Sequence, residues 1–372
     1  MLMAATRVGQ GPCDLCHTCR MRPRSTTARL AVGVVLALAG GLGLVLAAAS
    51  PAAADGARPS GYESVVDRVD PVVDGARVTV VGGDAFLQVT TRPGTEVVVP
   101  GYDGEPYLRI GRDGVVAVNR RSPAYWLNQS LDGRGTLPQS ASSSADPEWQ
   151  PTGARGRVAW HDHRIHWMLA ARPTAGPGGL VQEWSVPLSV NGQKATVEGR
   201  LLYLGATVPW PQLLLLALSG VGTAVLVGRW ARHRHQQLFT LFVASALALF
   251  LAWSTFRASP PDAGASLLPT LVAAAAMLLV AVAPGLPRVP LALASAATLI
   301  GWALVRSAAV WSPVVPTTLP GWVDRLGTVV VLGAAAGVAF VLVRHPLGPD
   351  AGPSAGGAED DGLPGSSAPE PA

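Results

Sequence analysis

The sequence has little charge for its length, and this scarcity is its first informative feature. Only 14% of its 372 residues are Asp, Glu, Lys or Arg, about half the usual share, whereas 49% are hydrophobic. A single lysine, Lys194, stands against 27 arginines. This composition excludes an ordinary soluble enzyme and an intrinsically disordered chain. It indicates long uncharged stretches beside normally charged ones.

Cysteine is also scarce, and its three copies, Cys13, Cys16 and Cys19, all lie near the start of the chain. Together with His17 they have the spacing of half a zinc site. The alternative, which we favour, is that they precede a later start at Met21. No cysteine follows, so the rest of the chain forms no disulfides and depends on its hydrophobic core for stability.

The first 54 residues predict a secretory signal peptide. A basic segment leads into an apolar run at residues 30–49, and small residues up to Ala54 are typical of a cleavage site. An uncleaved signal anchor is the alternative. This segment carries the whole net charge of +4, and 23 basic and 23 acidic residues remain in the rest of the chain. The remainder therefore predicts no basic surface for nucleic acid.

Residues 55–206 predict an extracytoplasmic all-β domain. Short runs rich in β-branched residues alternate with turns such as Asp103-Gly104, Asp113-Gly114 and Asn191-Gly192, which are typical of tight hairpins. We expect an antiparallel sandwich-like domain or a partly open barrel, with a mobile surface loop at residues 133–153. The expected strands are residues 77–81, 85–91, 96–99, 107–110, 115–119, 157–166, 181–190 and 194–204.

Residues 209–345 predict an all-α transmembrane region. Five uncharged apolar segments have about the length that crosses the hydrocarbon core of a bilayer. Arg229, Arg232 and Arg234 follow the first segment, and this excess of arginine predicts that its far side is cytoplasmic. The chain is then a multi-pass protein of the cell membrane with its β domain outside and its C-terminus in the cytoplasm. The expected helices are residues 212–228, 238–256, 266–283, 289–305 and 326–343.

The predicted membrane segments are poor in chemistry. They hold no Asp, Glu, Lys or His, which disfavours a pump or an ion-coupled carrier. Arg306, at the end of one segment, is expected to extend to the lipid interface, where the loop at residues 311–322 would anchor through its tryptophans. Residues 346–372 are acidic and rich in Gly, Pro and Ser, and they predict a disordered cytoplasmic tail.

Three closely spaced histidines are the sharpest chemical signal. His161, His163 and His166 stand in the segment RVAWHDHRIHWM, which ends at Met168. Imidazole is a common ligand of zinc and copper(II), and a thioether suits copper(I). These four residues therefore indicate an extracytoplasmic metal site, most plausibly for copper. On one strand the three imidazoles converge only if the strand is bulged.

Two other interpretations of the histidine segment remain open. In the structural one, which we favour, Asp162 pairs with Arg164 and the histidines form hydrogen bonds to neighbouring loops. In the other, the three imidazoles act as a pH sensor, because they titrate near pH 6.5 in model compounds.

Two loops carry weaker signals. The loop at residues 119–123, with Arg120 and Arg121, is either an anion-binding loop or, as we favour, a solvated one. The segment at residues 102–107 holds Asp103 and Glu105, which suit a carboxylate pair or, as we favour, a hairpin turn with exposed acids.

The histidine segment also carries a resemblance. Together with Val80-Val81-Gly82-Gly83-Asp84, the segment from Val99 to Leu108 and Asn119-Arg120-Arg121-Ser122-Pro123-Ala124, it resembles a family of exported multi-pass membrane proteins of actinobacteria. The likeness covers roughly residues 61–204. It implies the architecture of an external β domain on membrane helices and implies no activity.

The function predicted from the sequence is binding rather than catalysis. The chain has no G-x-S-x-G elbow, P-loop or H-E-x-x-H motif. We expect an integral envelope protein with an external ligand-binding or protein-interaction domain, whose helices contact the lipid bilayer and other membrane proteins. Copper handling is the alternative, and an enzyme or transporter with concealed machinery is a third.

Overall fold

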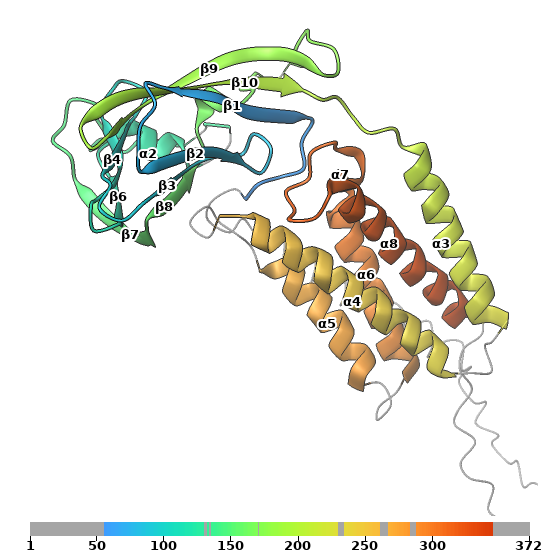
Figure 1. The fold of residues 1–372 in the computed structure, drawn as a ribbon. Coiled ribbons are helices and arrows are strands. Elements are labelled where there is room, and N and C mark those ends of the chain that lie inside the picture. The colour runs from blue at the N-terminus through green and yellow to red at the C-terminus, as the bar shows by residue number, and fades with distance from the viewer. Residues whose placement is uncertain are drawn as a thin grey trace, which may run out of the picture.

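The computed structural model describes residues 56–129, 132–133, 135–169, 171–229, 234–260, 267–282 and 288–344. Antiparallel β-sheets occupy residues 62–203, and a helical region with several long apolar helices follows (Figure 1). The mixed fold class is confirmed at this level. The predicted signal peptide and acidic tail lie outside the described residues.

The larger sheet has seven strands in the spatial order β1-β10-β9-β4-β5-β6-β7. The hairpin predicted at Asn191-Gly192 is confirmed. Both residues have positive φ angles, 51° and 85°, as a two-residue type I′ turn requires, and Val190 pairs with Gln193 across it. The strands are β1 (Tyr62–Asp70), β4 (Val97–Pro100), β5 (Pro106–Ile110), β6 (Val115–Asn119), β7 (Trp149–Arg155), β9 (Gly179–Val190) and β10 (Gln193–Tyr203).

The smaller sheet has three strands in the order β2-β3-β8, and it packs against the larger one. These strands are β2 (Ala76–Val81), β3 (Phe86–Thr91) and β8 (Arg157–Trp160). One hydrophobic cluster contains Val89 and Val158 from this sheet and Val97 and Val186 from the larger sheet, all at most 4% exposed. The core of the β domain therefore lies between two sheets.

Two strands were missed by the sequence analysis, and both lie at the ends of the larger sheet. β1 carries charged residues through its length, and its register with β10 shifts between Val66 and Arg68, so it shows no clear alternation. β7 contains Pro151 and Gly153 and overlaps the end of the segment that was expected to be a mobile loop, so that expectation is wrong for residues 149–153. An edge strand tolerates a proline because one of its sides forms no ladder.

The helical region places a helix at each of the five predicted apolar segments. Within the described residues, three helices are long and apolar enough to cross a membrane: Trp210–Arg229, Gln236–Ala258 and Gly321–Arg344. Two others are shorter, and a short helix, α7, precedes the last. The helices are α3 (Trp210–Arg229), α4 (Arg234–Ala258), α5 (Leu268–Val282), α6 (Arg288–Val305), α7 (Ser307–Trp311) and α8 (Gly321–Arg344).

Arg306 forms a buried ion pair between helices, which the sequence analysis did not predict. Its guanidinium donates to both carboxylate oxygens of Asp324, at 2.8 and 2.9 Å, and to the hydroxyl of Thr255 at 3.1 Å. The side chains of Arg306 and Asp324 are 10% and 0% exposed. Asp324 lies in the first turn of α8, where the helix dipole favours a negative charge, and the arginine compensates the buried carboxylate.

The two regions contact each other through the end of α7 and the segment between α7 and α8. Val314 forms a two-way backbone pair with Ser60, at 3.0 and 3.2 Å. Thr207, between β10 and α3, donates its backbone N–H to Trp311 and its hydroxyl to Val310, both at 3.0 Å. The loop expected to serve as an aromatic anchor thus also forms part of the junction with the β domain.

Candidate functional site: a cavity between the sheets

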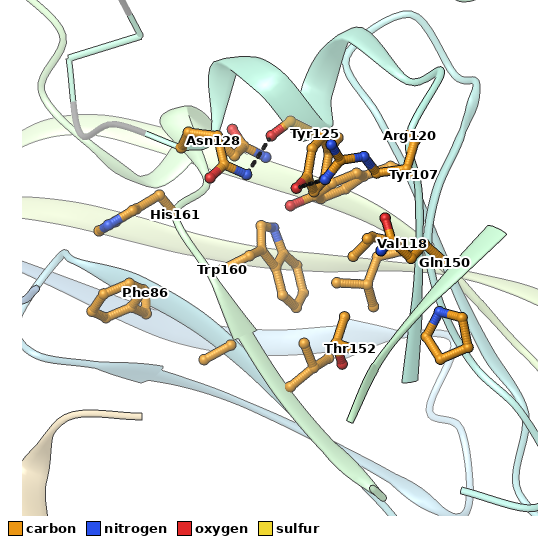
Figure 2. A pocket seen from close by; sticks show the side chains of 15 residues that line it. Phe86, Tyr107, Val118, Arg120, Tyr125, Asn128, Gln150, Thr152, Trp160 and His161 are labelled. Atoms are coloured by element: carbon orange, nitrogen blue, oxygen red, sulfur yellow. Dashed lines mark hydrogen bonds between the residues drawn. The ribbon is translucent and has the colours of Figure 1, made fainter. Parts of the chain in front are cut away.

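A cavity of about 330 Å³ opens where the two sheets separate, between β7 at the end of one sheet and β8 at the end of the other (Figure 2). This volume lies at the lower end of the range for small-molecule sites. The lining combines aromatic rings, side-chain amides and one arginine. The lining residues are Phe86, Tyr107, Leu108, Val118, Arg120, Tyr125, Asn128, Gln129, Gln150, Pro151, Thr152, Val158, Ala159, Trp160 and His161.

Arg120 is placed by the buried Asn119 at the end of β6. The Asn119 amide donates to the carbonyl of Pro106 at 2.6 Å, and its oxygen accepts the backbone N–H groups of Arg121 and Glu148. The backbone of Arg120 donates to Glu148 at 2.9 Å and accepts the indole N–H of Trp126 at 2.9 Å. The loop at residues 119–123 is therefore held on several sides.

Glu105 supports the same loop, and its predicted exposure is wrong. Its side chain is 5% exposed and accepts the hydroxyl of Ser122 at 2.6 Å and the backbone N–H of Ala124 at 3.4 Å. These donors lie at the start of the short helix α2 (Pro123–Leu127), where backbone N–H groups have no partner within the helix. The carboxylate thus fixes the helix that carries Tyr125 and Asn128.

The guanidinium of Arg120 lies among aromatic rings. It donates to the Tyr125 hydroxyl, and its carbon lies 4.5 Å from the Tyr125 ring centroid and 4.8 Å from that of Trp126. Its neighbour Arg121 faces elsewhere and pairs with Glu148. Among the described residues no carboxylate forms an ion pair with Arg120, so its charge is stabilised by the faces of two rings but is not neutralised.

Two tyrosines share Asn128 at the cavity: Tyr107 lines the cavity, and Tyr102 lies behind its lining. Tyr102 donates to Asn128 and accepts the backbone N–H of His163 at 3.0 Å. Burial raises the pKa of Tyr107 well above its ordinary value, and a hydrogen bond to Asn128 opposes this only partly. Burial, and then the charge of Asp162, raise the pKa of Tyr102 in the same direction. Both phenols therefore remain protonated donors at neutral pH.

The histidine segment forms a turn and not the expected long strand. β8 ends at Trp160, and Asp162 caps a 3₁₀ helix, η1 (His163–Ile165), by accepting the backbone N–H of Arg164 at 3.1 Å. A carboxylate that bonds its own backbone two residues on favours a turn over a strand. The predicted ion pair of Asp162 with Arg164 is present, with contacts of 2.7 and 2.8 Å.

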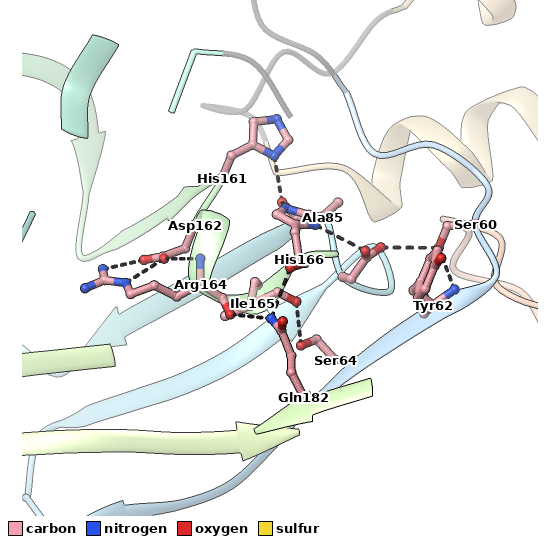
Figure 3. A network of polar contacts seen from close by, with 11 residues as sticks. Ser60, Tyr62, Ser64, Ala85, His161, Asp162, Arg164, Ile165, His166 and Gln182 are labelled. Atoms are coloured by element: carbon pink, nitrogen blue, oxygen red, sulfur yellow. Dashed lines mark hydrogen bonds and ion pairs between the residues drawn. The ribbon is translucent and has the colours of Figure 1, made fainter. Parts of the chain in front are cut away.

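His161 and His166 converge on the carbonyl oxygen of Ala85, at 2.7 and 3.2 Å (Figure 3). Their ring centroids are 6.1 Å apart. The other ring nitrogen of His166 faces Asp84 at 3.1 Å, and Asp84 accepts the hydroxyl of Ser60 at 3.2 Å. These hydrogen bonds to a neighbouring loop agree with the structural interpretation of both histidines.

His163 and Met168 lie in a different environment. The His163 ring stacks on Tyr102 with centroids 5.9 Å apart, and Met168 is 41% exposed. Both side chains lie beside Gly133. In the part of the chain that the structure describes, no three or more His, Cys, Asp or Glu side chains are grouped to hold a metal ion. The copper hypothesis for His161, His163, His166 and Met168 stays a prediction, which a copper titration of the full chain would test.

The comparisons with known proteins found no match: no family model, no curated protein and no solved structure is similar to this chain. The site must therefore be judged from its own geometry. The sequence analysis had singled out Arg120 and His161, but it missed Tyr125, Asn128 and Gln150. The signal that was available is the Asn-Arg-Arg-Ser-Pro-Ala-Tyr-Trp run, in which arginines stand next to aromatics just before a helix start.

Proposed function

We propose that this chain is a multi-pass membrane protein of the cell envelope, and that its sandwich-like β domain lies outside the membrane and binds a small ligand between its two sheets. The observation that carries the proposal is the cavity between β7 and β8, where the two sheets of the β domain separate. Aromatic walls with a few fixed polar groups are what ligand sites in proteins usually offer.

The helical region supports the membrane part of the proposal. Its long helices carry apolar side chains outward, among them Leu214, Leu218 and Val221 on α3. Arg229 ends α3 and Arg344 ends α8, at the ends remote from the β domain (Figure 1). Arginine enrichment marks the cytoplasmic side, so the β domain belongs on the opposite side. Contacts of these helices with other envelope proteins remain a prediction.

The proposal assigns binding and no catalysis. Besides the Arg120 guanidinium and the His161 imidazole, the polar groups of the cavity are amides, as in Asn128 and Gln150, and hydroxyls, as in Tyr107 and Thr152. Such groups orient a ligand. None of them forms, with its neighbours in the described residues, the nucleophile and base pair that acyl or phosphoryl transfer requires.

The test is to block the cavity at its rim. Thr152 is exposed and lines the cavity, so Thr152→Trp should narrow the opening and leave the buried core unchanged. Full-length protein in detergent is titrated calorimetrically with four ring probes: benzoate, benzamide, glucuronate and glucose. We expect at least one probe to bind, and to bind about tenfold more weakly to the variant.

The matched control is Thr90→Trp, an exposed threonine on β3 that does not line the cavity. It should bind the probes as the unmodified protein does. If none of the four probes binds, or if Thr152→Trp leaves their affinity unchanged, the cavity is not a ligand site and the proposal fails.

A further inference from the structure

The cavity has a single permanently charged residue in its lining. Of the fifteen lining residues only Arg120 carries a fixed charge, and no Asp, Glu or Lys is among them. Two buried carboxylates of the domain have other partners: Asp162 bonds Arg164 and the indole N–H of Trp160 at 2.9 Å, and Glu105 accepts the Ser122 hydroxyl and the backbone N–H of Ala124. The charge of Arg120 is therefore not cancelled by the cavity wall.

The hydrogen-bonding capacity of Arg120 is also largely unused. A guanidinium has five N–H donors, and within the described residues this one makes a single hydrogen bond, to Tyr125. By contrast, Arg164 and Arg200 in the same domain each form an ion pair with an aspartate. Since Arg120 is half-buried and held by its loop, its free donors lie ready for an acceptor in the cavity.

The wall opposite Arg120 is suited to a ring. Phe86 and Trp160 form part of it, and both are at most 5% exposed, so their positions are fixed by the core (Figure 2). Gln150 and Thr152 on β7 lie on the other side, at the rim. A ligand thus meets apolar and aromatic side chains in the interior of the cavity and amide and hydroxyl groups at its rim.

We propose that the cavity selects a small ring-bearing organic anion whose carboxylate pairs with Arg120 and whose ring lies against the aromatic wall. This inference rests on the proposed ligand-binding function and names the ligand class. The guanidinium fork matches a carboxylate with two parallel N–H···O bonds, which makes such pairs short and strong. Aromatic carboxylates and acidic sugars share this chemistry.

The test compares each anion with its neutral analogue. Benzoate and benzamide have the same ring and differ in charge, and glucuronate and glucose are the corresponding sugars. With full-length protein in detergent, we expect the anion of at least one pair to bind about tenfold more tightly than its neutral partner. The pair that shows the preference distinguishes an aromatic acid from an acidic sugar.

Substitutions test whether Arg120 causes the preference for the anion over its neutral analogue. Arg120→Met should abolish it, because the charge is lost, whereas Arg120→Lys should keep a weaker one. Gln150→Glu leaves Arg120 in place and should weaken binding of the anion with little effect on the neutral analogue. Arg121→Met removes the neighbouring arginine, which does not line the cavity, and should leave the preference unchanged.

The outcomes separate the two proposals. If the anion and its neutral analogue bind equally well in both pairs, or if the preference survives in both Arg120→Met and Gln150→Glu, the anion inference is wrong while the ligand site stands. If no probe binds at all, both proposals fail. Binding of inorganic phosphate as tightly as the ring carboxylates would also overturn the inference, because it would show that the ring contributes nothing.

Discussion

At the scale of single residues, Asp162 stabilises the turn that follows β8. It is fully buried and accepts hydrogen bonds from the Trp160 indole and from the backbone and guanidinium of Arg164. In Asp162→Asn the arginine loses its counter-charge in a site where it is only 21% exposed. We expect the variant to lose about 2–4 kcal/mol of local stability, measured by hydrogen exchange of residues 157–166.

A surface pair of the same chemistry provides the control. Asp67 accepts a bidentate contact from Arg200 at 2.8 to 3.0 Å, but both side chains are well exposed. Since water screens exposed ion pairs, Asp67→Asn should change the hydrogen exchange of its surrounding residues much less than Asp162→Asn does. Equal effects of the two substitutions would contradict the view that burial gives the Asp162 pair its importance.

The raised pKa of the buried Tyr107 predicts that the folded protein loses stability in alkali. Its folded-state pKa is raised by burial above the ordinary value of about 10, so the folded protein holds the phenol proton more tightly than the unfolded chain. The tighter binding of this proton adds to the free energy of unfolding. The added free energy is complete below about pH 10 and is lost above it, by about 1.4 kcal/mol per pH unit for each such tyrosine. Unfolding midpoints measured from pH 8 to pH 11 should fall less steeply in Tyr107→Phe.

At neutral pH the same variant should be less stable by about 1 kcal/mol, because Asn128 loses a hydrogen-bond partner. Parallel pH curves for the variant and the unmodified protein would rule out Tyr107 as a source of the alkaline slope.

The sequence is informative about residue contacts only over short distances. The ion pair of Asp162 with Arg164 joins residues two apart, and it was predictable from the segment itself. The acceptor shared by His161 and His166 is Ala85, 76 and 81 residues away, and it depends on how β3 and β8 pair. The cavity is equally non-local, because its lining comes from five strands, a short helix and the loops beside them.

At the scale of elements, α3 and α8 pack closely through small residues. A side chain at Gly337 would place its Cβ 2.6 Å from the Gly220 carbonyl oxygen, and at Gly333 it would lie 2.9 Å from the Gly220 backbone nitrogen. Small residues let helix backbones approach in this way in membrane proteins. We expect Gly337→Leu to separate the helices and to lower the midpoint of heat-induced aggregation in detergent by several degrees.

Gly222 on α3 is the matched control, because a side chain added there would meet nothing within 4 Å. Gly222→Ala should be neutral or slightly stabilising, since alanine favours the helix. A similar drop in both variants would show that glycine itself matters, and that the close approach of α3 and α8 does not.

Most elements were predictable where a local rule decides them. The Asn191-Gly192 turn made the hairpin of β9 and β10 predictable, and continuous apolar runs made the helices predictable. The rules failed for β1 and β7, which are edge strands whose partners, not their own patterns, make them strands. They also failed at η1, where the capping carboxylate of Asp162 overrides the strand pattern of its neighbours.

At the scale of the whole molecule, the two regions are joined by specific polar contacts. Ser60 pairs with Val314 of the helical region and also donates to Asp84, which faces His166 (Figure 3). A continuous chain of hydrogen bonds therefore leads from the helical region to the histidine segment, and His161 at its end lines the cavity. The division into β and helical parts was predictable from composition, whereas this junction was not.

The central claim is that the cavity faces the outside of the cell and holds a ligand, and one measurement tests both parts. Thr152→Cys places a thiol at the rim, in a background where Cys13, Cys16 and Cys19 are serine. Intact cells are treated with a membrane-impermeant thiol reagent, with and without the tightest of the four ring probes. The account predicts labelling in intact cells that the probe slows. Labelling only after the membrane is permeabilised, or at a rate that the probe leaves unchanged, would contradict it.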